Sequence, residues 1–216
     1  MIISESIADE LAFQLLRIGA VRFDLNNPFT WASGLKSPVY TDNRLTLSYT
    51  SIRKMIIEAF NGKINQLDYK PTAVAGVATA GIPHGVLLAE SQNLPFFYVR
   101  NSPKEHGLGK QIEGRLEMEW QVLVVEDLVS TGKSSLNVVK AIRNAGSYVD
   151  YVFSVFDYGF SKTQEIFSHE GIKLFSVCSF NSVLKKTQEL NLYNSETIRR
   201  LQNWHSNPEN WEQIFD

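Results

Sequence analysis

Runs of apolar residues alternate with amphipathic stretches along most of the chain. Short apolar, β-branched runs begin near residues 73, 95, 121, 149 and 172, and apolar residues at helical spacing occupy the stretches between them. This alternation predicts an α/β fold with a mostly parallel, Rossmann-like sheet flanked by helices. Amphipathic helices are also expected over residues 4–19 and beyond residue 180, where Trp204 and Trp211 should pack the tail down.

Residues 20–47 break the alternation. They are β-prone but interrupted by Pro28, Gly34 and Pro38, which predicts a small β-rich flap near the N-terminus. On composition alone a plain β-hairpin is an equally good interpretation. A long run from residue 100 to 115 is polar, charged and rich in glycine, as expected either for a functional lid or for a solvated loop.

The most informative stretch lies between residues 121 and 146. Val122 to Val125 form an apolar run that predicts a buried strand, and Glu126 and Asp127 follow at once. A hydroxyl-rich turn over residues 130–134 leads into an amphipathic helix, which Gly146 should end. Because the first N–H groups of a helix have no partner within it, such a turn is typical of an anion-binding site.

The chemistry of this turn indicates a phosphorylated ribose. Gly132 lets the backbone approach a ligand closely, and neighbouring hydroxyl groups can donate to a phosphate. Glu126 and Asp127 would repel phosphate, but ionised carboxylates accept hydrogen bonds from a ribose diol. A triphosphate-binding loop would need glycine where Asp127 stands, which disfavours it. An ordinary strand-to-helix turn remains the simplest alternative.

A second turn of this kind follows the apolar run over residues 73–78. Thr79, Ala80 and Gly81 lead from that predicted strand into a helix that continues from His84 to Gln92. Both turns follow the carboxyl ends of predicted strands, so they should share one edge of the sheet, where open α/β sheets bind ligands. Taken alone, the second turn could be a generic crossover.

Three motifs carry a resemblance to a known family. The sequence Val-Val-Glu-Asp-Leu-Val-Ser-Thr-Gly-Lys-Ser over residues 124–134 resembles the 5-phosphoribosyl pyrophosphate (PRPP) signature of type I phosphoribosyltransferases. The pattern of Phe29, Ser33, Gly34, Ser37, Pro38 and Tyr40 resembles the base-covering hood of the orotate phosphoribosyltransferases within that family. The spacing of Arg100, Lys104, His106 and Gly107 resembles their catalytic lid. The resemblance covers roughly residues 20 to 180.

This resemblance implies a reaction and an assembly. The expected activity transfers the phosphoribosyl group of PRPP to orotate, giving orotidine 5′-monophosphate and pyrophosphate, in pyrimidine biosynthesis. It implies a Mg²⁺ cofactor and a homodimer whose lids act across subunits. The chain should form one domain over residues 1–216, with a hood at 20–47 and a mobile lid at 100–115.

The resemblance also implies roles for individual residues. Arg100, Lys104 and His106 would be catalytic, with Lys104 leading, and Asp127 would hold the metal. Ser130, Lys36 and Tyr40 would bind orotate. The implied PRPP-binding residues are Arg100, Lys104, His106, Glu126, Asp127, Leu128, Val129, Ser130, Thr131, Gly132, Lys133, Ser134, Thr79, Ala80 and Gly81.

Three positions depart from the family pattern. Some orotate enzymes carry lysine where this chain has Ala32, Ala80 and Asn101, so three positive charges that could meet pyrophosphate are absent. Lys36 in the hood could compensate for one of them. Lys133 stands where a small residue is common and should point outward.

Composition narrows the remaining alternatives. The chain has 216 residues, a net charge of −2, and no apolar stretch as long as a membrane span, so neither nucleic acid nor membrane is an expected partner. A single cysteine, Cys178, suits a reducing compartment, and a cytoplasmic location is expected. A phosphoribosyltransferase for another base, or a PRPP-sensing regulator without activity, remains the rival interpretation.

Overall fold

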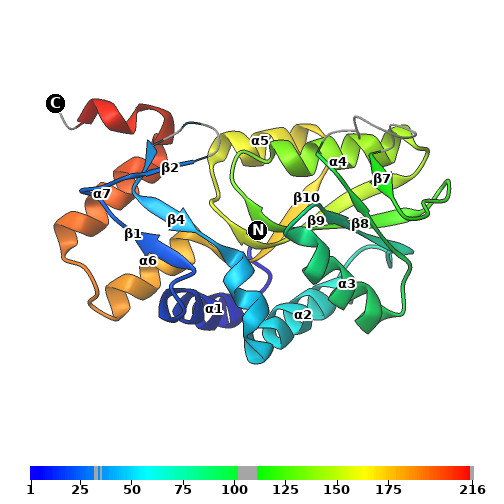
Figure 1. Ribbon diagram of the computed structural model, residues 1–216, viewed down its shortest axis with the longest axis horizontal. Coiled ribbons are helices and arrows are strands. Elements are labelled where there is room, and N and C mark those ends of the chain that lie inside the picture. The colour runs from blue at the N-terminus through cyan, green and yellow to red at the C-terminus, as the bar shows by residue number, and fades with distance from the viewer. Residues whose placement is uncertain (32–33, 35, 102–110, 215–216) are drawn as a thin grey trace.

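The structure, a computed structural model, describes residues 1–31, 34, 36–101 and 111–214. Its centre is a six-stranded sheet (Figure 1). The strands lie in the order β10, β9, β8, β5, β6, β7, and all neighbours are parallel except β6 and β7. The strands are β5 (Ala73–Val77), β6 (Phe96–Val99), β7 (Ile112–Glu113), β8 (Gln121–Val129), β9 (Tyr148–Asp157) and β10 (Lys173–Ser179). The predicted mostly parallel α/β sheet is confirmed.

Helices cover both faces of the sheet (Figure 1). They are α1 (Glu5–Arg17), α2 (Thr50–Ile64), α3 (Gly81–Gln92), α4 (Lys133–Asn144), α5 (Ser161–His169), α6 (Phe180–Glu189) and α7 (Ser195–Ser206), with a final 3₁₀ segment η2 (Pro208–Ile214). Successive side chains of β8 point to opposite faces of the sheet, and each face has its own core. Leu123 and Val125 pack with residues of α1–α3, whereas Val122 and Val124 pack with α4. None of the helices in the described ranges is long and apolar enough to cross a membrane.

The predicted N-terminal flap is a pair of two-stranded sheets. β1 (Val21–Phe23) pairs with β4 (Val39–Thr41), and β2 (Phe29–Thr30) pairs with β3 (Lys36–Ser37), both antiparallel. A 3₁₀ turn, η1 (Asn43–Ser48), connects this hood to α2.

The hood packs on aromatic side chains from the carboxyl end of β9 and from the tail. The ring of Trp31 lies 4.9 Å from that of Tyr158 and 6.0 Å from that of Trp204. Trp204 and Trp211 are both buried, which confirms that they pack the tail down.

Two strand boundaries differ from the sequence prediction. β8 continues to Val129, so Glu126 and Asp127 lie inside the strand rather than after it. Ile112 and Glu113, predicted as part of the lid, form the short strand β7 paired with β6. In both cases pairing with a neighbouring strand decides the structure. Neither residues 126–129 nor residues 112–113 form a long apolar run that would predict a strand from the sequence.

His84 is a buried, uncharged histidine on α3. It is fully buried, and neither ring nitrogen has a hydrogen-bond partner among the described residues. Burial, reinforced by the positive charge of Arg53, lowers the pKa of His84 to about 4. Below the ordinary histidine pKa of about 6.5, the unfolded chain takes up a proton that the folded chain does not. The stability of the fold should therefore fall as the pH drops from about 6.5 to about 4.

We expect His84→Gln to remove this acid sensitivity, because glutamine does not titrate. Between about pH 7 and about pH 5, the free energy of unfolding of wild type should fall by about 2 kcal/mol more than that of the variant. Urea unfolding at both pH values measures the difference. The matched control, His169→Gln, removes an exposed histidine at the end of α5 and should behave like wild type. Parallel pH curves for wild type and His84→Gln would contradict the prediction.

Candidate functional site

The two predicted anion turns meet at one edge of the sheet. β5 and β8 are adjacent parallel strands, so the turns that follow them leave the same edge. The contact is tight, because a Cβ built on Gly81 at the start of α3 would lie 2.5 Å from the carbonyl oxygen of Val125 and 3.2 Å from the Cα of Glu126. The β5–α3 turn therefore rests directly on the strand that carries the acidic pair.

In the turn between β8 and α4, no side chain at the N-cap accepts from the first backbone N–H groups of α4. Gly132 stands at the N-cap of α4 with a φ of 73° and offers no side chain to accept from the first turn of the helix. A Cβ on Gly132 would lie 2.4 Å from the ring of the buried Phe167. Thr163 Oγ1 on α5 donates to the carbonyl oxygen of Ser130 at 2.7 Å and fixes the turn from behind. These features suit a bound phosphate.

The β5–α3 turn occupies the matching place after β5 but offers fewer backbone donors. Ala80 stands at the N-cap of α3 and has no hydrogen-bonding side chain. The N–H of Ile82 donates to the carbonyl oxygen of Thr79 at 3.2 Å. Pro83 has no N–H, which leaves the N–H of Gly81 as the first-turn donor for a ligand. Thr79 is exposed at the turn, and the Ala78–Thr79 peptide bond is cis. Two helix N-termini therefore face one edge, each able to accept an anionic group.

The two carboxylates of β8 have different environments. Glu126 is buried, and its side chain accepts from Ser135 Oγ at 3.2 Å. Burial, and then the negative charge of Asp127, raise the pKa of Glu126 well above its ordinary value. Asp127 is half-buried; burial raises its pKa too, while Arg44 acts in the opposite direction. Asp127 is thus the more accessible acid, and Glu126 lies behind it.

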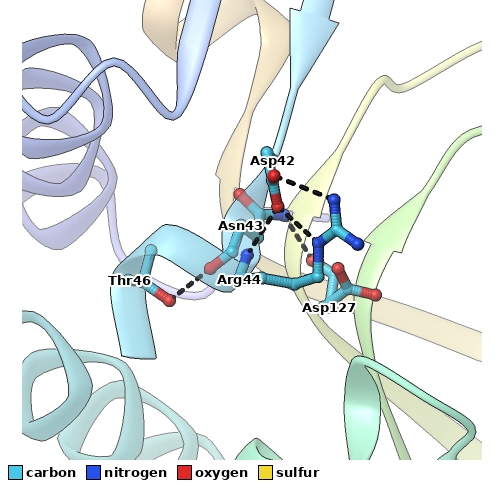
Figure 2. Close-up of polar contacts among 5 residues, drawn as sticks. All are labelled: Asp42, Asn43, Arg44, Thr46 and Asp127. Carbon is cyan, nitrogen blue, oxygen red and sulfur yellow. Dashed lines mark hydrogen bonds and ion pairs between the residues drawn. The ribbon is translucent and has the colours of Figure 1, made fainter. Parts of the chain in front are cut away.

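Residues that the sequence analysis missed attach the hood to this edge. Asn43 Nδ2 donates to the main-chain oxygen of Asp127 at 2.7 Å, and Thr46 Oγ1 donates to the main-chain oxygen of Asn43 at 2.6 Å. Asp42 accepts from Arg44 through both side-chain oxygens, beside Asp127 (Figure 2). The polar sequence Asp42-Asn43-Arg44 was the available signal, but the hydrogen-bond partner of Asn43 lies 84 residues away in the chain.

The hood residues predicted to bind orotate lie on its strands. Lys36 is half-buried on β3, and Tyr40 is half-buried on β4. The Tyr40 ring lies 5.4 Å from the ring of Phe29, and the guanidinium of Arg22 lies 5.0 Å from its centre. The hydroxyl group of Tyr40 is also one of the groups that lower the pKa of Asp42. Tyr40 and the residues beside Asp127 therefore belong to one polar network.

Arg100 and Gln111, at the two ends of the segment between β6 and β7, are hydrogen-bonded to each other. Arg100 N donates to the main-chain oxygen of Gln111 at 3.0 Å, and Gln111 Nε2 donates to the main-chain oxygen of Arg100 at 2.6 Å. Arg100 is half-buried at the end of β6. Lys104 and His106 lie outside the described residues.

The other residues predicted to bind PRPP lie in the two turns or in the strand and helix ends beside them, but their exposure differs. Thr131 and Lys133 are exposed. The half-buried members are Leu128, Ser130, Ser134 and Ala80, and the buried ones are Val129, Gly132 and Gly81.

We expect Gly132→Ala to destabilise the fold more than Gly159→Ala. Both glycines have a φ near 73° (73° and 72°), so alanine at either position carries the same left-handed strain of about 1–2 kcal/mol. Only at Gly132 does the new methyl group also overlap the buried Phe167 ring, which should cost about 1–3 kcal/mol more. Urea unfolding of both variants measures the difference. Equal losses would mean that Phe167 does not constrain the turn.

Comparisons with known proteins agree with this geometry. A family model described as a phosphoribosyl transferase domain matches residues 47–155. An orotate phosphoribosyltransferase of Listeria monocytogenes serotype 4b (strain F2365) is 43% identical over 206 residues, which is 95% of this chain and 99% of that protein. Another, from Streptococcus thermophilus (strain CNRZ 1066), is 42% identical over 207 residues, with 96% and 99% covered.

Solved structures are similar over most of their length. The orotate phosphoribosyltransferase of Aeropyrum pernix has a TM-score of 0.70 at 30% identity and covers 85% of this chain and 99% of that chain. That of Mycobacterium tuberculosis H37Rv in complex with PRPP has a TM-score of 0.64 at 26% identity, with 82% and 98% covered. Since the likeness extends over nearly the whole of both chains rather than over one turn, this chain belongs to the orotate phosphoribosyltransferase family.

Proposed function

We propose that this chain transfers the phosphoribosyl group of PRPP to orotate, releasing pyrophosphate and forming orotidine 5′-monophosphate for pyrimidine biosynthesis. The observation that carries the proposal is that two helix N-termini meet Glu126 and Asp127, near the carboxyl end of β8, at one sheet edge. A phosphoribose with a second phosphate group needs this combination. Relatives named orotate phosphoribosyltransferase supply the choice of base.

The β8–α4 turn would hold the 5′-phosphate and the β5–α3 turn the diphosphate. The ribose diol would donate to Asp127 at the edge, with Glu126 behind it. Breaking the bond at ribose C1 builds positive charge on the ring and negative charge on the departing diphosphate. The acids tolerate the first charge, and N–H groups and cations around the turns neutralise the second.

A Mg²⁺ ion fits the donor set but would depend on the substrate for most of its ligands. Within the described ranges, no cluster of three or more His, Cys, Asp or Glu side chains could hold a metal by itself. Mg²⁺ is commonly bound by one or two carboxylates together with substrate phosphates, and Asp127 is the accessible carboxylate here. The ion would neutralise charge on the diphosphate.

The lid would complete the site. Arg100 at its base, with Lys104 and His106 along it, would bring positive charge to the diphosphate and exclude water. Lys104 is the proposed leading catalytic residue, and His106 would donate a proton or a hydrogen bond. We propose that the chain forms a homodimer in which each lid closes over PRPP in the neighbouring subunit. The expected cytoplasmic location stays a prediction from the sequence.

The hood would supply the contacts to orotate. Lys36 and Tyr40 lie on its strands, and Ser130 lies at the phosphate turn, where a base attached to ribose C1 would reach both. A lysine ammonium can pair with the orotate carboxylate, and an aromatic ring can stack on the base. These assignments rest on the hydrogen bond from Asn43 to Asp127, which holds the hood next to the carboxyl end of β8.

We expect the purified protein to consume orotate when PRPP and Mg²⁺ are present, and Lys104→Ala to lose about 10²–10⁴-fold in kcat, because a positioned charge or proton donor is removed at the reacting centre. Loss of orotate absorbance measures both. Lys140→Ala is a suitable control, since Lys140 is an exposed residue of α4 whose ion-pair partner is Glu170. Turnover of uracil or hypoxanthine without orotate would contradict the base assignment.

Two further conditions separate the parts of this proposal. Chelation by EDTA should abolish turnover and added Mg²⁺ should restore it; full activity in EDTA would remove the metal from the mechanism. Tight PRPP binding without transfer to any base would identify a regulator instead of an enzyme.

We expect a mixture of two inactive variants, Lys104→Ala and Asp127→Asn, to regain activity. If lids act across subunits, each mixed dimer contains one site with an intact acid and an intact lid from its neighbour. Equal mixing makes half the dimers mixed, so roughly a quarter of wild-type activity should return after subunit exchange. Each variant alone provides the baseline. No recovery, although mass spectrometry shows mixed dimers, would place lid and acid in the same subunit.

A further inference from the structure

Arg44, whose side chain is held by Asp42, lies beside Asp127 near the carboxyl end of β8, and the proposed function gives it no role. Asp42 Oδ1 accepts from Arg44 Nε at 2.6 Å and Asp42 Oδ2 accepts from Arg44 Nη2 at 2.9 Å, while the backbone N–H of Arg44 also donates to Oδ1 at 3.2 Å (Figure 2). This two-point pairing holds the guanidinium plane in one orientation. The hydrogen bond with Asp42, and then its charge, raise the pKa of Arg44.

The same short segment is tied to β8. Asn43, between the paired residues, is buried and donates to the main-chain oxygen of Asp127 at 2.7 Å. Figure 2 shows the guanidinium of Arg44 and the carboxylate of Asp127 side by side at the end of the strand. Their charges affect each other, since Asp127 contributes to raising the pKa of Arg44 and Arg44 contributes to lowering that of Asp127. The position of Arg44 relative to Asp127 is thus fixed by two independent sets of contacts.

The pairing with Asp42 leaves donors free. A guanidinium has five N–H groups, and Asp42 accepts from Nε and Nη2 only. Nη1 of Arg44 has no hydrogen-bond or ion-pair partner among the described residues, and the side chain is 65% exposed. The guanidinium side of the pair is largely exposed, so it adds little to fold stability, and Asp42 caps η1 through the backbone N–H of Arg44 without needing the guanidinium.

The location of Arg44 selects the group it can meet. In PRPP the two ribose hydroxyl groups are on C2 and C3, and the diphosphate is bonded to the neighbouring carbon, C1. If the diol binds to Asp127, the diphosphate oxygen on C1 therefore lies beside Asp127. The β5–α3 turn, which would hold the diphosphate, packs on Val125 and Glu126, one residue before Asp127. That turn carries Thr79, Ala80 and Gly81 and so brings no positive side chain of its own. A cation beside Asp127 fills this gap.

We propose that Arg44, oriented by Asp42, binds the diphosphate of PRPP and neutralises charge on it as it leaves. This inference rests on the proposed function. Arg44 would act as a substrate-binding residue through its free N–H groups, and Asp42 as a positioning residue that touches no substrate. The pair would supply part of the positive charge that Ala32, Ala80 and Asn101 do not.

The test compares Arg44→Gln, Arg44→Lys and Asp42→Asn with wild type. For Arg44→Gln, kcat/KM for PRPP should fall about 10- to 100-fold, the factor expected for a lost hydrogen bond between charged groups. KM for orotate should stay within about twofold, because orotate carries no diphosphate. Arg44→Lys keeps the charge without the planar fork and should recover part of the loss. Asp42→Asn should lie between wild type and Arg44→Gln.

Two inhibitors distinguish the diphosphate from the rest of PRPP. Pyrophosphate should inhibit Arg44→Gln about 10- to 100-fold more weakly than wild type. Ribose 5-phosphate lacks the diphosphate and should inhibit both equally. Arg17→Gln is the matched control, since Arg17 is an exposed arginine of α1 whose side-chain partner is Gln14, and it should match wild type in both assays. Thermal melting checks that each variant is folded.

The outcomes separate this inference from the function on which it rests. No orotate turnover by wild type would overturn the proposed function itself. Turnover by wild type with unchanged PRPP and pyrophosphate constants in Arg44→Gln would overturn the role of Arg44 alone. A raised KM for orotate only, or an equal loss for ribose 5-phosphate and pyrophosphate, would assign Arg44 to the base or to general folding and would equally overturn it.

Discussion

In the proposed function the site holds phosphate groups beside two carboxylates, and much of its structure would reduce this electrostatic conflict. Unscreened charges of one sign a few ångströms apart repel strongly once water is excluded. Burial of Glu126, and then the negative charge of Asp127, raise the pKa of that acid and so favour the neutral form. Asp127 faces Arg44. The N-termini of α3 and α4 would then present their positive ends to bound phosphate groups.

The same arrangement couples recognition of the base to recognition of the sugar. The hood has only short strands, and two-residue pairings such as β2–β3 are marginal without support. Its support comes from Trp31 on the Tyr158 and Trp204 rings and from the amide of Asn43 on Asp127. A displacement of β8 at its carboxyl end would therefore move both Asp127, the acid proposed to bind the ribose, and the hood that carries Tyr40.

Sequence reasoning reached the features that are encoded locally. Apolar runs at fixed intervals located the parallel strands, and the strand–turn–helix at residues 121–146 has a signature that needs no partner to be visible. The sequence analysis missed contacts between residues that lie far apart in the chain. Nothing around Asn43 indicates that its amide reaches the main chain of Asp127, and the pairing of Ile112 and Glu113 with β6 depends on a neighbouring strand. Glu126 and Asp127 looked equivalent because burial is a tertiary property.

The absent lysines show that a residue missing from a motif does not by itself mean that its charge is missing from the site. Motif comparison alone counts Ala80 and Asn101 as losses, since each lacks a charge found in some relatives. The diphosphate needs positive charge in its vicinity, not at a particular place in the sequence, because Coulombic stabilisation depends on distance and desolvation. Arg44 on η1, held by the carboxylate of Asp42 at the N-cap, is proposed to meet that need in place of a lysine in the β5–α3 turn. A two-point pairing also restricts the guanidinium before the ligand arrives, which lowers the conformational entropy lost on binding.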